Sequence, residues 1–389
     1  MNETRIMTIG EVCATVSDTY RAKADEVTLI NTSDVLEGKV LNHERVPNKE
    51  LKGQFKKTFK KDDILYSEIR PQNKRFAFVD FNPVDYIAST KLMVLRADTS
   101  KVLPMYLYYH LKSAPVITEL QMLAETRSGT FPQITFTELS NLTIPVPSIT
   151  EQEVIVATIK CIEDKIDCNA KINDNLLEQI QALYKAWFVD HLPFGGVKPE
   201  SWTQTDIYSL ANIIYGAPFV SKQFNTEGNG KPIVRIRDLK DQQFATYTTE
   251  VHPKGYLLQP GDVVVGMDGE FRPYIWGNDE AWLNQRVCVF ENKRPNGKAF
   301  LYFTIKPLLF AIEQTQVATT VIHIGKKDYD AFEITLPDSS TLDSFDALTS
   351  PMIMRIVSNS FENKRLAAMR DTLLPKLMSG EIDVSNIEI

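Results

Sequence analysis

The sequence is poor in the residues from which metal sites, disulfides and membrane spans are built. It holds four cysteines and five histidines among 389 residues, and no two cysteines form a CxxC pair. This spacing favours free thiols in a reducing cytosol over a metal or disulfide role. No apolar run approaches the roughly 20 residues that a membrane span needs. The first residues lack the basic-then-apolar layout of a secretory signal. We therefore expect a cytoplasmic globular protein, too long for one ordinary core.

The sequence also lacks the motifs by which many catalytic sites are recognised. It contains no P-loop, HExxH or GxSxG motif, and no nuclease D…ExK set follows a predicted strand. The segment NPVDY (82–86) is only partly similar to the N/D-PP-Y/F motif of adenine methyltransferases, because the second proline and a glycine-rich cofactor loop are absent. The sequence therefore predicts no catalytic residue, no metal site and no cofactor bound by this chain.

An excess of positive charge is missing as well, but the charge is unevenly distributed. The net charge is −7. Residues 151–190 carry four basic and eight acidic side chains, and residues 338–389 carry five and eight, so the rest of the chain is balanced. Within that remainder, the segment KELKGQFKKTFKK (49–61) holds six lysines and one glutamate. The overall charge therefore does not exclude a nucleic-acid partner.

An internal repeat organises the chain. A shift of 190 residues places TIPVP (143–147) on EITLP (333–337), each closing a β-like stretch before a helical region. Further upstream, KDDILYSEIRP (61–71) resembles PGDVVVGMDGE (260–270) at a shift of 199. The pattern predicts an α/β (α+β) protein, in which two mixed α/β lobes are joined by two long antiparallel coiled-coil helices with a pseudo-twofold internal repeat. The predicted regions are lobe 1 (1–147), the first long helix (148–192), lobe 2 (193–337), and the second long helix with the chain end (338–389).

The first long helix has an apolar seam with a 3.5-residue repeat, which is typical of a coiled coil. The seam consists of ten positions: Ile155, Ile159, Ile162, Ile166, Asn169, Asn173, Leu176, Ile180, Leu183 and Trp187. At a shift of 190 residues the second helix repeats the seam, with Asn359 and Asn363 at the positions of the two amides and with Arg370 as a poor match to Ile180. In an antiparallel pair Asn169 faces Asn363 and Asn173 faces Asn359, and buried amides of this kind fix the register. The alternative is that these asparagines face solvent at a helical irregularity.

The ends of the helices carry start and stop signals. TEQE (150–153) predicts a capping box between Thr150 and Glu153. Pro351 is expected to separate residues 341–349 from the second helix, Pro375 to kink it, and Gly380 to end it. A paired stretch of 33 residues is roughly 50 Å long at 1.5 Å per residue. Two similar lobes at a fixed separation suit a long pseudo-symmetric ligand such as duplex DNA.

The candidate DNA contacts are basic, amide and hydroxyl side chains, with His323 and Tyr274, in loops near strand ends and in the lysine run. Lysines suit phosphate contact, whereas arginine, asparagine and glutamine read base edges in the major groove. For any single residue, a plain surface role is an alternative. The candidates are Lys52, Lys56, Lys57, Lys60, Lys61, Arg70, Asn73, Lys74, Arg75, Arg127, Ser128, Thr130, Arg235, Arg237, Arg272, Tyr274, Gln285, Arg286, Thr319, His323 and Lys326.

With these features in place, the chain resembles the specificity (S) subunits of Type I restriction–modification enzymes. The resemblance covers essentially the whole chain and rests on the order of lobe and helix and on three segments. These are IPVPSITEQEVIVATI (144–159), ALYKAWFVDHLPFGGVKPESW (182–202) and ENKRLAAMRDTLLPKLMSGEIDV (362–384). LPDSSTLDSF (336–345) departs from the pattern, because it lacks the EQ pair of residues 151–152. The docking of partner subunits on the second helix is therefore expected to differ in detail from that on the first.

The resemblance implies that each lobe is a target recognition domain and that the paired helices set an unread spacer. It also implies that methyltransferase (M) subunits, two in number, dock on the helical region, and that translocase/nuclease (R) subunits join them. S-adenosylmethionine, ATP and Mg²⁺ would then belong to those partners. Because the two lobes differ in sequence, the expected double-stranded DNA target is bipartite and asymmetric.

Three alternatives stay open at this point. The chain could serve a related restriction system in which it positions a nuclease. It could be a coiled-coil scaffold that binds proteins, which a salt-dependent affinity for duplex DNA would argue against. A stand-alone methyltransferase is disfavoured by the missing motifs.

Overall fold

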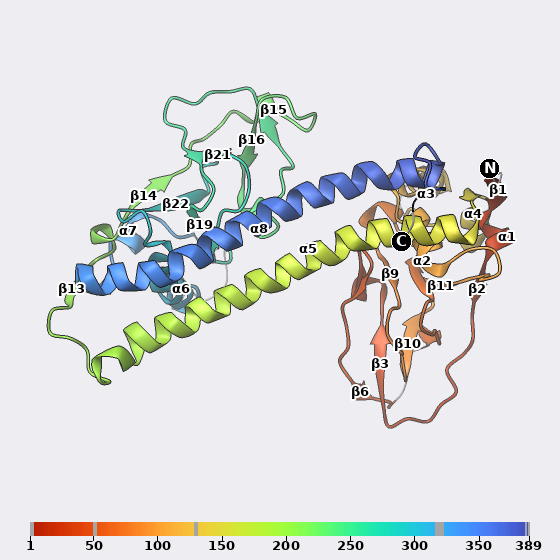
Figure 1. Cartoon of the computed structure of the whole chain (residues 1–389), viewed down its shortest axis with the longest axis horizontal. Coiled ribbons are helices and arrows are strands. Elements are labelled where there is room, and N and C mark those ends of the chain that lie inside the picture. The colour runs from red at the N-terminus through yellow and green to blue at the C-terminus, as the bar shows by residue number, and fades with distance from the viewer. Residues whose placement is uncertain (1–3, 50–52, 128–130, 316–322, 386, 388–389) are drawn as a thin grey trace. The chain divides into compact units, whose positions relative to one another are not determined.

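The computed structural model describes residues 4–49, 53–127, 131–315, 323–385 and 387 (Figure 1). The chain forms two compact units, which we call unit 1 (residues 1–164 and 367–389) and unit 2 (residues 165–366). Each unit contains one lobe together with a segment of each long helix, α5 (Ile149–Tyr184) and α8 (Ser339–Ser379). Among the described residues, no helix is long and apolar enough to cross a membrane.

Helix α5 begins at Ile149, ahead of the predicted capping box. The observed capping box joins Ser148 and Glu151: the Ser148 N–H donates to Glu151 Oε2 at 2.9 Å, and the Glu151 N–H donates to Ser148 Oγ at 3.3 Å. The predicted box between Thr150 and Glu153 is therefore wrong, because both residues lie inside the helix. A π-helical turn, Lys185–Val189, continues α5.

Helix α8 is continuous, so the predicted break at Pro351 is wrong. A proline leaves the carbonyl four residues earlier without its helical donor. Ala347, the residue concerned, is exposed, so water can satisfy that carbonyl. Phe345 and Ile353 flank the proline and are buried in the core of unit 2, which keeps the helix in place. Gly380 has a φ of 77° and follows the last residue of α8, as expected for a helix stop.

The lobe of unit 1 is built on two four-stranded sheets, with strand orders β6-β3-β10-β7 and β2-β11-β8-β9. A two-stranded pair, β4-β5, lies beside them, and β1 pairs with β12. The elements of this lobe are β1 (Arg5–Thr8), α1 (Ile9–Val12), β2 (Cys13–Val16), β3 (Glu26–Ile30), β4 (Val35–Leu36), β5 (Lys39–Val40), β6 (Val46–Pro47), β7 (Phe55–Lys57), β8 (Ile64–Ser67), β9 (Phe76–Phe78), β10 (Tyr86–Ser89), β11 (Leu92–Ala97), α2 (Pro104–Leu111), α3 (Ala114–Arg127), α4 (Phe136–Ser140) and β12 (Thr143–Val146).

The lobe of unit 2 repeats this plan. Its sheets have the orders β14-β22-β19-β20 and β15-β17-β16-β21-β18, and β13 pairs with β23 as β1 does with β12. Helix α6 takes the place of α2 and α3. The elements are β13 (Thr203–Asp206), β14 (Ala211–Tyr215), β15 (Phe224–Asn225), β16 (Lys231–Val234), β17 (Tyr247–Thr248), β18 (Leu257–Leu258), β19 (Val263–Gly266), β20 (Pro273–Ile275), β21 (Ala281–Leu283), β22 (Val287–Asn292), α6 (Lys298–Thr315), α7 (Lys326–Tyr329) and β23 (Glu333–Leu336).

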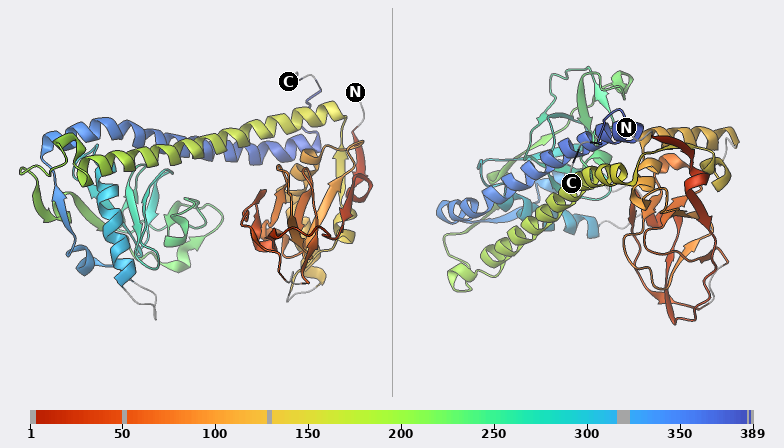
Figure 2. Two further views of the ribbon diagram at one scale, coloured as in Figure 1. Left: turned by 90° about the horizontal axis from the view of Figure 1, so that it is seen from below. Right: turned by 45° about the vertical axis from the view of Figure 1, so that its right-hand side comes forward.

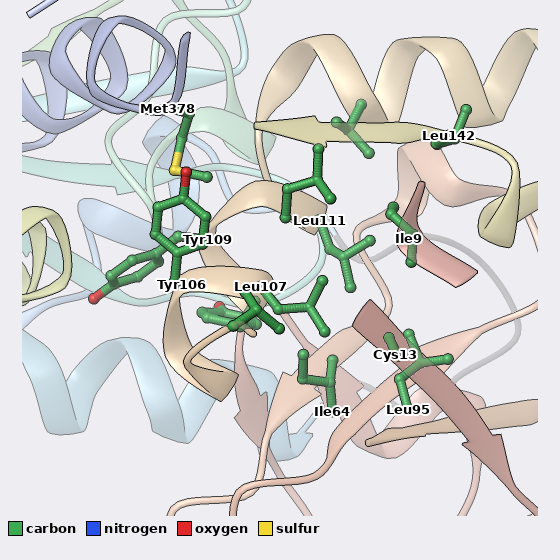
Figure 3. Packing of buried hydrophobic residues seen from close by; sticks show 14 of the residues in the cluster. Ile9, Cys13, Ile64, Leu95, Tyr106, Leu107, Tyr109, Leu111, Leu142 and Met378 are labelled. Carbon is green, nitrogen blue, oxygen red and sulfur yellow. The ribbon is translucent and has the colours of Figure 1, made fainter. Parts of the chain in front are cut away.

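The core of each unit is completed by segments of both long helices. In unit 1, Ile155 and Ile159 of α5 and Leu377 and Met378 of α8 belong to the cluster formed by β8, β11, α2 and α3. Figure 3 shows Met378 of α8 together with Tyr106 and Tyr109 of α2 in this cluster. In unit 2, Ile180 of α5 and the buried face of α8 join the cluster around β19, β22 and α6, which lies against the helices (Figure 2). Residues far apart in the sequence therefore share each core.

Two pairs of asparagine side chains lie in the seam between α5 and α8 in unit 2. Asn169 Nδ2 donates to Asn363 Oδ1 at 2.9 Å, and Asn359 Nδ2 donates to Asn173 Oδ1 at 2.8 Å. These are the two pairs that the 190-residue offset predicts. Asn169 is fully buried and Asn359 is 1% exposed, so these two amides do not face solvent.

Two further amide bonds follow the same symmetry. Asn173 Nδ2 also donates to the carbonyl of Ile356 at 3.2 Å, and Asn363 Nδ2 donates to that of Ile166 at 3.1 Å. Exchanging each residue for its counterpart 190 positions away converts one bond into the other, so these four bonds have a local twofold symmetry. Two additional bonds, from Asn169 Nδ2 to Glu362 Oε2 at 2.8 Å and from Asn173 Nδ2 to Ser360 Oγ at 3.4 Å, have no such counterpart. The paired residue numbers rise along α5 and fall along α8, and the helices are therefore antiparallel here.

We predict that replacing one seam amide destabilises the protein more than replacing both members of a pair. Asn173→Leu leaves the Nδ2 of buried Asn359 without its acceptor, which costs about 1–3 kcal/mol. The double variant Asn173→Leu/Asn359→Leu removes both polar groups and is expected to recover most of this loss. The free energy of unfolding, measured by chemical denaturation, tests the difference.

The matched control is Asn175→Leu, which changes an exposed asparagine on the same helix. It is expected to alter the free energy of unfolding by about 0.5 kcal/mol or less. Equal effects of Asn173→Leu and Asn175→Leu would contradict a buried, paired amide.

Candidate nucleic-acid interfaces

Unit 2 has a shallow depression at one edge of its five-stranded sheet. Its lining residues follow β16 and β21, which pair in parallel with Val234 opposite Leu283. Parallel strands end on the same side of a sheet, so the loops that follow them meet there. Four of the lining residues are predicted DNA contacts. The cavity, of about 390 Å³, is lined by Arg235, Ile236, Arg237, Asn284, Gln285 and Arg286.

Arg286 belongs to a small polar cluster beside this depression. Its Nη1 lies 3.5 Å from Asp268 Oδ1 and 3.2 Å from His323 Nδ1, and the same His323 nitrogen lies 2.6 Å from the Asp268 oxygen. Asp268 and His323 are brought together by an antiparallel β-bridge. Arg286 and His323 are about half exposed, so both predicted residues can reach a ligand.

The two other arginines of the depression differ in their freedom. The Arg235 guanidinium contacts Thr246 Oγ1, and its Nε lies 3.4 Å from Asp238 Oδ2. Only 25% of the Arg235 side chain is exposed, compared with 67% for Arg237. We therefore expect Arg235 to hold the loop in shape and Arg237 to be the more available contact.

The other predicted contacts of unit 2 are engaged to different degrees. Arg272 donates through Nη2 to Glu313 Oε1 of α6 at 3.1 Å, and this pair raises the pKa of Arg272 and lowers that of Glu313. Lys326 pairs with Asp330 at 2.7 Å but stays 71% exposed. Tyr274 is half-buried on β20, and burial raises the pKa of its hydroxyl. We expect Arg272 mainly to tie its loop to α6.

Unit 1 repeats the loop frame. Its strands β3 and β10 pair in parallel, and the segments 31–34 and 90–91 follow them. The first loop makes the same turn in both units, because the Asn31 N–H donates to Asp34 Oδ2 at 2.7 Å and the Arg235 N–H donates to Asp238 Oδ2 at 3.0 Å. The backbone frame is thus shared by the two units, whereas the side chains that it presents differ.

Residues 68–75 form a loop after β8, as the sequence predicts. Arg70 and Asn73 are exposed. Lys74 is 52% exposed and pairs with a glutamate at 2.9 Å. Arg75 is different, because its Nη1 donates to two backbone carbonyls, of Ser33 at 2.9 Å and Val35 at 3.4 Å. We therefore expect Arg75 to shape the loop rather than to contact a ligand directly.

The lysines of the run at residues 49–61 differ in their exposure. Lys56, Lys60 and Lys61 are exposed. Lys57 is turned inward, where its Nζ donates to the carbonyls of Thr90 at 3.1 Å and Leu92 at 2.8 Å. Burial lowers the pKa of Lys57. Four described lysines of the run, Lys49 among them, are exposed and remain suited to phosphate contact, while Lys57 ties β7 to the turn between β10 and β11 and to the start of β11.

The remaining predicted contacts lie at the end of α3 or outside the described parts of the chain. Arg127 is the last residue of α3, although the sequence pattern predicts a loop there. The other residues concerned lie outside the described parts of the chain, and they are Lys52, Ser128, Thr130 and Thr319.

A polar cluster in unit 1 was not predicted from the sequence. Lys91 Nζ lies 3.4 Å from Glu68 Oε2 and 3.3 Å from Gln133 Oε1. The segment YIASTKLMVLRA (86–97) resembles one β stretch, which hides the turn between β10 and β11 in which Lys91 lies. The Ser89-Thr90-Lys91 sequence in the middle of this segment could have indicated the turn, because it corresponds to Asn284-Gln285-Arg286 in the second copy of the repeat.

The cysteines form no disulfide among the described residues, and the two buried ones are not reactive thiolates. All four are free: Cys13 and Cys288 are buried, and Cys161 and Cys168 are exposed on α5. Burial raises the pKa of the Cys13 and Cys288 thiols to about 12, so neither is a thiolate near neutral pH. Among the described residues, no group of three His, Cys, Asp or Glu side chains is placed to hold a metal ion.

Comparison with known proteins connects these surfaces to one family. The model of the Type I restriction modification DNA specificity domain matches residues 1–178 and 199–350. The Type I restriction enzyme HindI specificity subunit of Haemophilus influenzae is 29% identical over 98% of this chain and 100% of its own. The EcoBI specificity subunit of Escherichia coli is 37% identical over 36% of this chain and 29% of its own.

A solved structure supports the fold assignment. The S subunit of the Type-I restriction-modification system from M. genitalium matches with a TM-score of 0.57 and 17% identity, covering 97% of this chain and 96% of that one. Because the family model covers well over half of the sequence, the chain belongs to the family of Type I restriction–modification DNA specificity subunits.

Proposed function

We propose that this chain is the DNA-reading subunit of a Type I restriction–modification complex and that each unit reads one half of an asymmetric bipartite target. The observation that carries the proposal is the pair of loop surfaces. Each follows two parallel strands of equivalent sheets, β3 and β10 in unit 1 and β16 and β21 in unit 2. A shared frame that presents different side chains suits two different half-sites.

The side chains in these loops suit readout of base edges. Arg237, Gln285 and Arg286 line the depression of unit 2, and arginine and glutamine pair with guanine and adenine in the major groove. Lys56, Lys60 and Lys61 of unit 1 are exposed and suit the phosphate backbone, which supplies affinity but no sequence information. The chain would therefore combine general attraction to DNA with specific contacts.

The two long helices have a separate role in this proposal. Their seam register, set by the four asparagines, would fix the number of unread base pairs between the half-sites. Their outer faces would dock methyltransferase subunits, two per chain, which restriction subunits then join. This chain would itself be non-catalytic, and S-adenosylmethionine, ATP and Mg²⁺ would be bound by those partners.

The first test is methylome sequencing of a host that expresses the chain with its neighbouring methyltransferase gene. We expect an N6-methyladenine motif made of two unlike halves around a fixed gap. The motif should disappear when the chain is deleted and the methyltransferase is kept. Identical or palindromic half-sites would contradict one reader per unit, and unchanged methylation after deletion would favour a protein-binding scaffold.

A second prediction concerns the lysine run. Removing one lysine–phosphate interaction is expected to lower the slope of log affinity against log salt concentration by about 0.9. We therefore expect Lys56→Ala, Lys60→Ala and Lys61→Ala to weaken binding of the complex to target and non-target duplexes alike. Titrations at several salt concentrations give the slopes.

Two lysines of unit 1 serve as controls. Lys101→Ala removes a charge that pairs with Asp98 at 2.9 Å, away from the run, and is expected to leave the slope unchanged. Lys57→Ala is expected to lower the stability of the fold, because the carbonyls of Thr90 and Leu92 lose their donor. Slopes that do not distinguish Lys60→Ala from Lys101→Ala would rule the run out as a phosphate contact.

A further inference from the structure

The polar clusters of Lys91 and Arg286 occupy the same place in the two units. In unit 1 the Glu68 N–H donates to the carbonyl of Lys91 at 3.0 Å, and in unit 2 the Met267 N–H donates to the carbonyl of Arg286 at 2.9 Å. The carbonyl of Glu68 also accepts a hydrogen bond of 2.9 Å from the Ile134 N–H, and the carbonyl of Met267 accepts one of 2.9 Å from the Ile324 N–H. The same backbone contacts therefore join three segments in each unit, those around Glu68, Lys91 and Ile134 in unit 1 and their counterparts in unit 2.

The side chains on this frame match in chemical type. Lys91 corresponds to Arg286, and Gln133 corresponds to His323, since Ile69 bridges to Gln133 as Asp268 bridges to His323. Both clusters contain a carboxylate, but at positions that differ by one residue. In unit 1 it belongs to Glu68, which corresponds to Met267 of unit 2. In unit 2 it belongs to the next residue, Asp268, which corresponds to Ile69 of unit 1. Each cluster thus contains a cation, a carboxylate and a third polar side chain.

The exposure of these groups is also alike. The cations are half exposed, 49% for Lys91 and 55% for Arg286, whereas their carboxylate partners Glu68 and Asp268 are only 20% and 24% exposed. The carboxylate therefore lies beneath the cation and holds it at the surface. Within the described part of the chain, the cluster contacts of Arg286 use Nη1, so its Nε and Nη2 remain for a ligand.

We propose that each cluster is a guanine-reading site, in which the cation determines specificity and the carboxylate positions the cation. Guanine offers the O6 and N7 acceptors in the major groove, and arginine or lysine is the usual partner of both. The Nε and Nη2 donors of Arg286 form a fork that fits this pair of acceptors, while Lys91 offers one remaining N–H. The proposal rests on the proposed function and names the base that each unit reads at this point.

An ordinary surface ion pair explains the clusters less well. Such pairs contribute little to stability, and there is no reason for a repeat with divergent loops to keep one at the same place. A carboxylate beneath the cation also repels phosphate, which directs the cation toward a base edge instead of the DNA backbone. The guanine assignment accounts for the position, the exposure and the charge of the two clusters together.

The first experiment compares methylomes of hosts that express the methyltransferase subunits with the full-length chain or one of four variants: Arg286→Ala, Asp268→Asn, Lys91→Ala and Glu68→Gln. Arg286→Ala is expected to relax one G·C position of one half-site, with a loss of discrimination of about 5- to 150-fold. Asp268→Asn should relax the same position, by about tenfold. Lys91→Ala and Glu68→Gln should relax one G·C position of the other half-site.

The matched controls are two surface ion pairs with half-exposed lysines. Lys231→Ala breaks a 3.3 Å pair with Glu280 in unit 2, and Lys101→Ala breaks the pair with Asp98 in unit 1. Both are expected to leave the motif unchanged. A structural role for the clusters would instead lower methylation at every site without changing base preference at one position, and that outcome would overturn the proposal.

A chemical substitution in the DNA tests the guanine contact directly. Replacing the guanine at the relaxed position by 7-deazaguanine removes the N7 acceptor, so binding of the wild-type complex to the target duplex should weaken about tenfold. The Arg286→Ala complex should bind the normal and substituted duplexes equally. Equal binding by the wild type, or relaxation at an A·T position, would overturn the guanine assignment. Absence of any chain-dependent motif would instead remove the proposed function and this inference with it.

Discussion

The pairing of four asparagine amides in the seam of α5 and α8 is the interaction on which the rest of the structure depends. Asn169 and Asn359 are buried, and in the observed register the Nδ2 of each donates to an asparagine of the other helix, while Asn169 Oδ1 has no hydrogen-bond partner among the described residues. A slip of one heptad would place an amide against isoleucine, at a cost of about 1–3 kcal/mol for each unpaired group. The register in turn decides which stretch of each helix is available to complete the core of each unit.

The two units share their backbone arrangement but differ in the side chains that a ligand would contact. The sheets have equivalent strand orders, and the closing pairs β1-β12 and β13-β23 are the same. Even the seam differs locally: Arg370 lies near Glu163 in unit 1, whereas the equivalent positions in unit 2 are the buried Ile180 and Ile353. The loops after the parallel strands also differ in sequence, with Ser89-Thr90-Lys91 in unit 1 and Asn284-Gln285-Arg286 in unit 2, so one frame presents two different sets of side chains.

The features that the sequence predicts well are those carried by regular spacing along the chain. The 3.5-residue seam and the 190-residue offset are local patterns, and they lead to the asparagine pairs without any knowledge of the lobes. The roles of Lys57 and Arg235 could not be predicted, because no regular spacing links Lys57 to the carbonyls of Thr90 and Leu92 or Arg235 to the hydroxyl of Thr246. Pro351 misled for a related reason: the helix continues through it because Phe345 and Ile353 are held by the core of unit 2.

A carboxylate beneath a cation changes what that cation can bind. A free lysine or arginine loses up to about 2 kcal/mol of side-chain entropy when a ligand orders it. On the proposed assignment, Glu68 and Asp268 lower this cost by ordering Lys91 and Arg286 beforehand, and their charge disfavours phosphate. Within the described residues, no ion pair engages Lys56, Lys60 or Lys61, which leaves their full charge for the DNA backbone. The same two side-chain types would thus serve sequence readout in one place and general attraction in another, and the neighbouring carboxylate makes the difference.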